Sequence, residues 1–531
     1  MQLIKNLFKY LLILIGVAAF AIAAMASIMF FFPNVSLFGY HYQASHKNHI
    51  LMLNTDSISK VKVVTNNYNI NIRPNDNLTN PDVFRIVIKD DYVGFTNSKE
   101  KELFVNGKGV SEFSAENIEN YQEATGEYIF DLTELTGIIA YGSSSVDVYV
   151  PTNFTTEYYL ETHAGKINFQ ANPNNLNEKV HTDNITIKVN SSRGDFDIEH
   201  VNIEPTATVD ITNYLGRTNI SNEIGGSVKI SSKTGSFYFS KINQNLIVSG
   251  ENPYVSFNEL GGYLKFTSPS GLLDAGIVNG NVKVETSNGT IKIRKIVNLA
   301  TVDNSYGDVV INQIGENEMD DSYSVSITGG TGTIQIGQEQ VYDNVSYKGV
   351  YGKISSIITT TGRVVLENVY SPLTLADNET KITTTKGSVT VNFADTNTPK
   401  VKFIVVSTES GAIKLNNIYG EIEAQTQNSA TITATFKALY KVANFTTDEG
   451  AINLKLAYVT NAENRQLVLN MLNKANKVNL EIGDFAVNSF DENSKDQDGY
   501  YTSQHYFPTE ITSSDNVITA KTNNGRIKIS D

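Results

Sequence analysis

The most regular pattern in the chain is a glycine followed, two and four positions later, by apolar residues of the kind found in strands. Polar residues rich in Thr, Ser and Asn come directly before the glycine. Copies of this pattern occupy Thr162–Phe169, Thr286–Ile293, Thr359–Leu366, Thr384–Val391 and Thr522–Ile529. Because residues two apart lie on the same face of a strand, each copy predicts a polar turn and a short strand with one buried face.

A single turn and strand cannot bury its apolar face alone, so the copies must stack on one another. The motif glycines are nine residues apart at Gly271, Gly280 and Gly289 and about two dozen apart at Gly362 and Gly387, which predicts coils of two or three strands. The glycines are interpreted as turn residues with a positive φ. The predicted fold is all-β, an elongated stack of β-strand repeats of the β-solenoid or β-helix kind. Its core should contain Ile291, Ile293, Val389, Val391, Ile413 and Leu415.

An apolar run near the N-terminus, Tyr10–Phe32, predicts a transmembrane helix because it is long enough to cross a hydrocarbon core of about 30 Å. Lys5 and Lys9 precede the run, and the next basic residue is Lys47. The positive-inside rule then places residues 1–9 in the cytoplasm and the C-terminal ectodomain outside, in a single-pass protein of the cell membrane. A signal peptide cleaved after Ala24-Met25-Ala26 is the alternative, but the apolar run continues beyond that point, which favours a retained helix.

The remaining chain divides into four regions by its pattern of apolar, polar and glycine residues. Alternation of apolar and polar residues without the glycine motif is typical of a cap that covers the open end of a stack. The segment Ala462–Lys474 is a helix candidate, with a polar excursion between strands as the alternative. The predicted regions are a juxtamembrane linker over 33–49, a β-rich N-terminal cap region over 50–159, the repeat array over 160–456, and a C-terminal β region with a polar insertion and closing strands over 457–531.

The composition excludes several classes of function. The formal net charge is −14 and Lys and Arg form no cluster, so nucleic acid is not expected as a partner. The chain has no cysteine, which excludes disulfides, thiolate metal sites and a cysteine nucleophile. Tryptophan is also absent, which weakens a carbohydrate-stacking hypothesis, although the 27 tyrosines can substitute in part.

Candidate metal ligands occur at three places in the sequence, and at each the alternative without a metal is favoured. His41, His46 and His49 lie together, but no carboxylate or thiolate framework accompanies them. Gly329–Ile334 is similar to a calcium-binding nonapeptide, but Ile334 stands where that motif requires Asp. Asp491–Gly499 is rich in oxygen ligands but lacks the EF-hand pattern, so a solvated acidic loop is predicted.

Catalytic motifs are not found. The chain has neither a Gly-x-Ser-x-Gly elbow nor a phosphate-binding loop. The carboxylate pairs Asp90-Asp91 and Asp320-Asp321 would matter for glycoside hydrolysis only if they faced each other across a groove. We therefore predict no catalytic, cofactor-binding or metal-binding residues and no cofactor.

Three stretches give the chain a resemblance to a known family. They are Val146–Pro151 followed by Tyr159–Phe169, the repeated Thr/Ser-x-x-Gly-x-Ile-x-Ile segments, and the closing pair Val517–Ile529. With these, the region from Lys60 to the C-terminus resembles a bacterial family of β-strand-repeat ectodomains that is named for an adhesin role and has no known function. The insertions Lys99–Gly126 and Asn461–Gly499 depart from its pattern. The resemblance implies a stacked β fold and supplies no catalytic residues.

The predicted function is that of a membrane-anchored extracellular β-repeat protein without catalytic activity, acting in adhesion or cell-envelope interaction. Its expected partners are the membrane, through one N-terminal helix, and a cell-envelope polymer or surface protein. One alternative is a polysaccharide lyase or hydrolase on a β-helix, which a cluster of Asp, Arg and Lys in a groove would favour. The other is an accessory protein in envelope-stress sensing.

Overall fold

The computed structural model describes residues 2–31, 41–54, 60–65, 68–75, 82–96, 103–105, 108–110, 127–132, 137–142, 144–151, 154–163, 165–172, 179–189, 196–198, 201–316, 323–370, 379–394, 403–418, 421–437, 442–456, 467–482, 485–491, 493–507 and 516–530. The chain divides into two compact units, Met1–Ser231 and Ser232–Asp531. Within the described residues, the regular structure of both units consists of strands, apart from one N-terminal helix in the first.

Helix α1 (Gln2–Phe31) contains most of the predicted membrane segment. Its described apolar side chains are exposed, Leu14 by 68% and Phe20 by 77%. Among the residues that the structure describes, no helix meets the combined length and hydropathy that a membrane span requires. The transmembrane assignment of Tyr10–Phe32 therefore stays a prediction.

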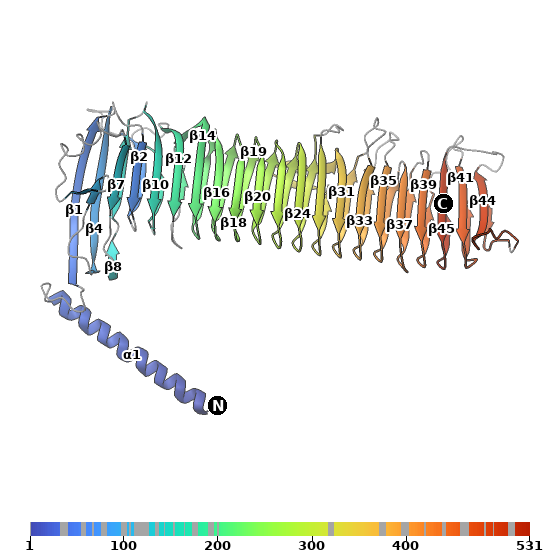
Figure 1. The fold of residues 1–531 in the computed structure, drawn as a ribbon, viewed down its shortest axis with the longest axis horizontal. Helices are drawn as coiled ribbons and strands as arrows, with labels where there is room; N and C mark the ends of the chain where they lie inside the picture. The colour runs from blue at the N-terminus through green and yellow to red at the C-terminus, as the bar shows by residue number, and fades with distance from the viewer. Residues whose placement is uncertain are drawn as a thin grey trace. The chain divides into compact units, whose positions relative to one another are not determined.

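In the first unit, consecutive strands alternate between two parallel sheets, and each strand pairs with the strand two places along the chain (Figure 1). Two strands therefore make one coil, the smaller of the predicted numbers. Tyr158 and Phe169, from the two sheets of one coil, meet edge to face at 5.8 Å, so the inward faces share one core. One sheet contains β2 (Lys60–Thr65), β10 (Thr155–Thr162), β12 (Val180–Val189), β14 (Val201–Asn213) and β16 (Ser227–Ser232), and the other contains β3 (Asn69–Pro74), β11 (Ile167–Phe169), β13 (Phe196–Ile198) and β15 (Arg217–Ile224).

The second unit repeats this arrangement with a regular register. Residues eighteen apart, such as Ser236 and Tyr254, are paired. One sheet contains β18 (Leu246–Gly250), β20 (Leu264–Ser268), β22 (Val282–Thr286), β24 (Leu299–Asn304), β26 (Ser324–Gly329), β31 (Lys353–Thr359), β33 (Glu379–Thr384), β35 (Phe403–Thr408), β37 (Ile422–Thr426) and β39 (Val442–Thr447). The other contains β17 (Ser236–Ile242), β19 (Tyr254–Leu260), β21 (Leu272–Val278), β23 (Ile291–Ile296), β25 (Val309–Ile314), β27 (Ile334–Ile336), β32 (Val364–Val369), β34 (Val389–Phe393), β36 (Ile413–Ile418), β38 (Ile432–Phe436) and β40 (Ile452–Lys455).

The alternation of apolar and polar residues explains the core of the second unit. Every second side chain of each strand points inward, and all six predicted core residues are at most 1% exposed, which confirms that prediction. Two short pieces interrupt the regular coils. Strand β30 (Gly349–Val350) bridges β25 and β32, and β28 (Gln340–Tyr342) and β29 (Val345–Tyr347) form a separate hairpin.

The repeated turn is held by a hydrogen bond within the motif. The amide of Gly387 donates to the hydroxyl of Thr384 at 2.7 Å, and that of Gly411 donates to Thr408 at 2.8 Å. The prediction that the motif glycines have a positive φ was wrong, because neither of these two glycines lies in the left-handed region. A Cβ at Gly387 or Gly411 would instead lie 1.9 Å from the carbonyl oxygen of the motif glycine one coil earlier. Stacking distance, rather than turn conformation, thus requires glycine here.

The N-terminal cap is formed by β1 (His41–Asn54), β4 (Val83–Thr96), β5 (Leu103–Val105), β6 (Lys108–Val110), β7 (Glu127–Leu132), β8 (Gly137–Gly142) and β9 (Ser145–Val150), together with β2 and β3. Strand β2 lies between β7 and β10, and β3 lies between β9 and β11. Antiparallel β4 then covers β9 and pairs with β1 and β8. The predicted linker over 33–49 was therefore wrong from His41 onward, because β1 gains a full ladder with β4.

The C-terminal cap is formed by β41 (Leu467–Asn473), β42 (Val478–Ile482), β43 (Phe485–Val487), β44 (Tyr501–Phe507), β45 (Val517–Thr522) and β46 (Ile527–Ser530). The last coil, β45–β46, lies between β39–β40 and β41–β42. The helix candidate over Ala462–Lys474 was wrong over β41, which pairs with β44 and β45. Leu467, Leu469, Met471 and Asn473 are buried with the period of a strand.

Candidate functional site

The structure places the candidates from the sequence in separate parts of the chain. His41, His46 and His49 belong to β1, and Asp90 and Asp91 belong to β4, but their side chains lie outside the described residues. The pair Asp320-Asp321 also lies outside them. Residues 329–334 contain the turn between β26 and β27. None of these candidates is therefore placed in a site by the structure.

The acidic segment Asp491–Gly499 is built from turns in which carboxylates bind backbone amides. Asp491 Oδ1 accepts the amide of Asn493 at 2.9 Å, and Asp496 Oδ1 accepts the amide of Tyr500 at 2.8 Å. Such bonds are typical of Asp in turns. Across the part of the chain that the structure describes, no group of three or more His, Asp or Glu side chains gathers as metal ligands would.

The most unusual chemistry lies in the N-terminal cap, around Asp147. Val146, Val148 and Val150 of β9 face the core, so Asp147 and Tyr149 face the opposite side of the strand. That side is covered by long side chains from β3 and β4. Among the described residues Asp147 is the one charged residue that is buried, with 1% exposure. A buried carboxylate is costly unless it is paired and hydrogen-bonded.

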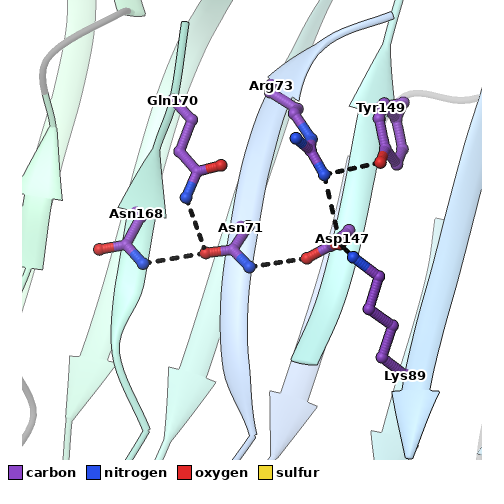
Figure 2. A network of polar contacts seen from close by, with 7 residues as sticks. All are labelled: Asn71, Arg73, Lys89, Asp147, Tyr149, Asn168 and Gln170. Carbon is purple, nitrogen blue, oxygen red and sulfur yellow. Dashed lines mark hydrogen bonds and ion pairs between the residues drawn. The ribbon is translucent and has the colours of Figure 1, made fainter. Parts of the chain in front are cut away.

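Both oxygens of Asp147 have partners (Figure 2). Oδ1 accepts a hydrogen bond of 2.6 Å from the Asn71 amide. Oδ2 forms ion pairs with Lys89 Nζ at 2.6 Å and with Arg73 Nη2 at 3.3 Å. The network extends to β11, since the side-chain oxygen of Asn71 accepts a bond from Asn168 at 2.9 Å. Asp147 thus ties three neighbouring strands together.

A second row of side chains lies next to the Asp147 cluster on the same three strands, β3, β9 and β4. The register aligns Arg73 of β3, Tyr149 of β9 and Arg85 of β4. Arg73 donates to the Tyr149 hydroxyl at 2.6 Å. The guanidinium carbons of Arg73 and Arg85 lie 4.4 and 3.7 Å from the centroid of the Tyr149 ring, distances at which a cation is attracted to an aromatic face.

The electrostatics of Asp147 indicate a fixed anion. Burial raises the pKa of Asp147, but the hydrogen bonds from Asn71 and Lys89 and the charges of Lys89 and Arg73 outweigh it and leave the pKa below its ordinary value. A general base must reach its substrate and accept a proton near the working pH. Asp147 is covered and holds its charge, so its arrangement suits clamping of strands rather than proton transfer.

Val146–Pro151 was singled out from the sequence as part of the family resemblance, but this cluster was not predicted. Asp147 stands at a polar position of an alternating strand, which normally faces water. Arg73 is 74 residues away from Asp147 along the chain, and Asn71 is 76 away. Only the register of β3, β9 and β4 brings these side chains together, and no local signal encodes it.

Comparison with known proteins identifies the repeat. The family model described as Toastrack DUF4097 matches residues 117–392. This match covers β7–β9 of the N-terminal cap and the coils as far as β34. No curated protein and no solved structure matches the chain. The adhesin role implied by the resemblance is not part of this finding. The chain belongs to the Toastrack family, a repeat-like domain family of unknown function.

Proposed function

We propose that this protein is a non-catalytic, membrane-anchored binding protein of the cell envelope. The observation that carries the proposal is how the coils use their side chains. Inward positions form the core and turn positions bind the neighbouring coil, which leaves the outward positions for a ligand. The register aligns these outward positions in rows, as for Ser256, Asp274 and Lys292. Such rows favour binding of an extended partner, an envelope polymer or surface protein, over a large surface.

The anchor is proposed from the N-terminal segment. Tyr10–Phe32 is apolar, Lys5 and Lys9 precede it, and α1 exposes its described apolar side chains. A helix of 30 residues is about 45 Å long, more than a hydrocarbon core requires. The N-terminus would then lie inside and the strands outside. External protease on intact cells should remove the strand region, and a mature N-terminus at Ser27 would exclude the anchor.

The binding role is tested by comparing deletions with point changes. Envelope retention, measured as binding of the detergent-solubilised full chain to membrane-free envelope material, should be abolished by deleting whole coils, for example residues 246–281. Single changes of Asp320, Asp321 or Asp496 to Ala should alter retention little, because no one residue carries an extended contact. Retention that survives the coil deletion would contradict the proposal.

The second candidate, a polysaccharide lyase or hydrolase, would require a cluster of Asp, Arg and Lys that a substrate can reach. The Asp147 cluster combines Asp, Arg and Lys on one face of the sheet. Incubation of the protein with a panel of polysaccharides tests this candidate. Release of sugars or unsaturated products that is lost in Asp147→Asn would establish it, whereas we expect no release.

A further inference from the structure

The turns of three successive coils in the second unit enclose a hollow of about 250 Å³ on the surface. The first turn follows β24 and contains Tyr306. The second begins after Gly329, the last residue of β26, and contains Gly330. The third follows β31 and contains Thr360. The register places Gly329 beside Asn304, a buried motif position, so the side chain that the middle coil lacks is one that would face the core.

The backbone of Gly329 and Gly330 forms the floor of the hollow, and polar side chains form its walls. Tyr306 is 63% exposed and forms the largest wall. Asp303 and Thr328, which are paired in the register, line one side, and Thr331 and Thr360 also line the space. Within the described part of the chain, these five side chains make no hydrogen bond to other protein groups, so their hydrogen-bonding groups are free for a ligand.

The backbone groups of the floor already form hydrogen bonds with the neighbouring coils. The carbonyl oxygen of Gly330 accepts the amides of Thr360, Thr361 and Gly362 at 3.0, 2.9 and 3.0 Å. The amide of Thr331 donates to Ser305 at 3.0 Å. An added peptide strand binds mainly through unpaired backbone groups of a sheet edge. The floor does not offer these groups, so recognition here must use side chains.

We propose that this hollow is a subsite for one neutral or amino pyranose unit of a glycan. A pyranose presents an apolar C–H face and a rim of hydroxyl groups. The exposed Tyr306 ring offers an apolar surface with a polar tip, and a few polar groups beside it can orient the hydroxyls. Among the described residues, Asp303 is the one charged residue lining the hollow, and its negative charge disfavours phosphate and uronate ligands.

This inference rests on the proposed binding function and names its ligand class. The hollow holds one sugar unit, so a single subsite should bind with a dissociation constant on the order of millimolar. Tyr306 departs from the residues at the same place in the neighbouring motif turns, where Asn288 precedes Gly289 and Thr361 precedes Gly362. The subsite is thus local and is not repeated by those turns.

The test uses saturation-transfer NMR of the full chain with cellotriose, chitotriose, trigalacturonate and trialanine. Cellotriose or chitotriose should receive signal on its ring C–H protons. Tyr306→Ala should weaken binding at least fivefold, and Tyr306→Phe should change it less than twofold because the ring remains. Gly329→Ala should leave binding nearly unchanged, because a Cβ there would lie 3.1 Å from the buried side chain of Ile334 and would not enter the hollow.

Tyr214→Ala provides the matched control. Tyr214 is 45% exposed and also lies in an Asn-x-x-Gly turn, in the first unit. Binding should be unchanged in this variant. The inference is overturned if both neutral sugars give no signal, if Tyr306→Ala binds as well as the parent, or if trigalacturonate or trialanine binds in preference.

The outcomes separate this inference from the proposed function. If coil deletion abolishes envelope retention but Tyr306→Ala leaves sugar binding unchanged, the subsite is wrong and the binding function stands. If sugar binding depends on Tyr306 but coil deletion leaves retention intact, the subsite stands and the proposed envelope role is wrong. Circular dichroism of each variant confirms that a loss of binding is not a loss of fold.

Discussion

In the N-terminal cap the strand pair β2–β3 lies between two other strand pairs, and in the C-terminal cap β45–β46 lies between two others in the same way. Both caps then add an antiparallel strand, β4 on β9 in the first and β44 on β41 in the second. An antiparallel strand ends a parallel ladder and covers the edge that another chain would otherwise join.

The two caps differ in the side chains that hold them. The N-terminal cap uses a buried carboxylate, Asp147, with Lys89 and Arg73. The C-terminal cap uses Tyr500, which is 8% exposed and donates to Asn523 at 2.5 Å. The ammonium groups of Lys474 and Lys521 each lie 4.5 Å from the centroid of the Tyr500 ring. One strand order is thus compatible with either ionic or aromatic contacts.

In both caps, the insertion of one strand pair between two others closes the end of the stack. The side-chain contacts then adjust the stability of each cap. A strand pair held on both sides cannot fray without breaking two ladders. The caps should consequently respond alike to loss of the interleaved coil and differently to charge, pH and ring removal.

The largest effect is expected from removing the interleaved coil. Truncation after Phe507 deletes β45–β46, which leaves facing edges on β39–β40 and β41–β42 unpaired. The C-terminal cap should lose its protection from hydrogen exchange, and the protein should aggregate through the open edges. Deleting β2–β3 should do the same in the N-terminal cap.

The hairpin β28–β29 provides the control for these deletions. In the described part of the chain its strands pair only with each other. Removing residues 340–347 should leave exchange protection elsewhere nearly unchanged. Equal damage from this deletion would show that interleaving is not the cause.

Among single substitutions, the largest loss of stability is expected for a core residue of a regular coil. Ile291 is fully buried, so Ile291→Asp places an unpaired charge in the core and should destabilise the second unit by about 4 kcal/mol. The neighbouring change Lys292→Asp faces outward and is the control. Thermal unfolding of the two variants measures the difference, and a small effect at Ile291 would contradict the stacked core.

Single substitutions in the caps should be smaller and should separate the two chemistries. Tyr500→Ala should destabilise the C-terminal cap by about 3 kcal/mol, mainly through the cavity left by the ring. Asp147→Ala should destabilise the N-terminal cap by about 2 kcal/mol, less than for a fully buried pair because Lys89 can turn towards water. Added salt should reduce the penalty at Asp147 more than that at Tyr500. Site-resolved hydrogen exchange assigns each effect to its cap, and equal salt responses would contradict the comparison.

The smallest effect concerns pH. The pKa of Asp147 lies below its ordinary value near 3.8, so its stabilising contribution is fully present above that value and is lost as the pH falls through the lowered pKa. The N-terminal cap should therefore lose stability as the pH falls below the ordinary value of 3.8, and Asp147→Asn should flatten this dependence. Urea unfolding at several pH values measures it. An unchanged pH profile in Asp147→Asn would exclude the carboxylate as its source.

Particular residues show how far sequence reasoning reached. Ile291 and Val389 were assigned to the core correctly, because alternation within a strand is a local property. The motif glycines were recognised, but the need for glycine was attributed to a positive φ and not to the close approach of the neighbouring coil. The segment around Met471 was a helix candidate because Val468, Met471 and Leu472 have helical spacing, whereas Leu467, Leu469 and Met471 have strand spacing. Only pairing with β44 and β45 decides between the two.

The sequence by itself determined the stacked β architecture, since apolar periodicity and a repeated Gly turn leave few ways to bury the core. Tertiary structure alone decided the two-strand coil, the interleaved caps, the Asp147 cluster and the hollow beside Tyr306. Each of these depends on which strand lies next to which, and strands far apart in sequence become neighbours through backbone pairing that is almost independent of residue identity. The physical origin of the candidate sites is therefore register, which the linear pattern of the chain does not contain.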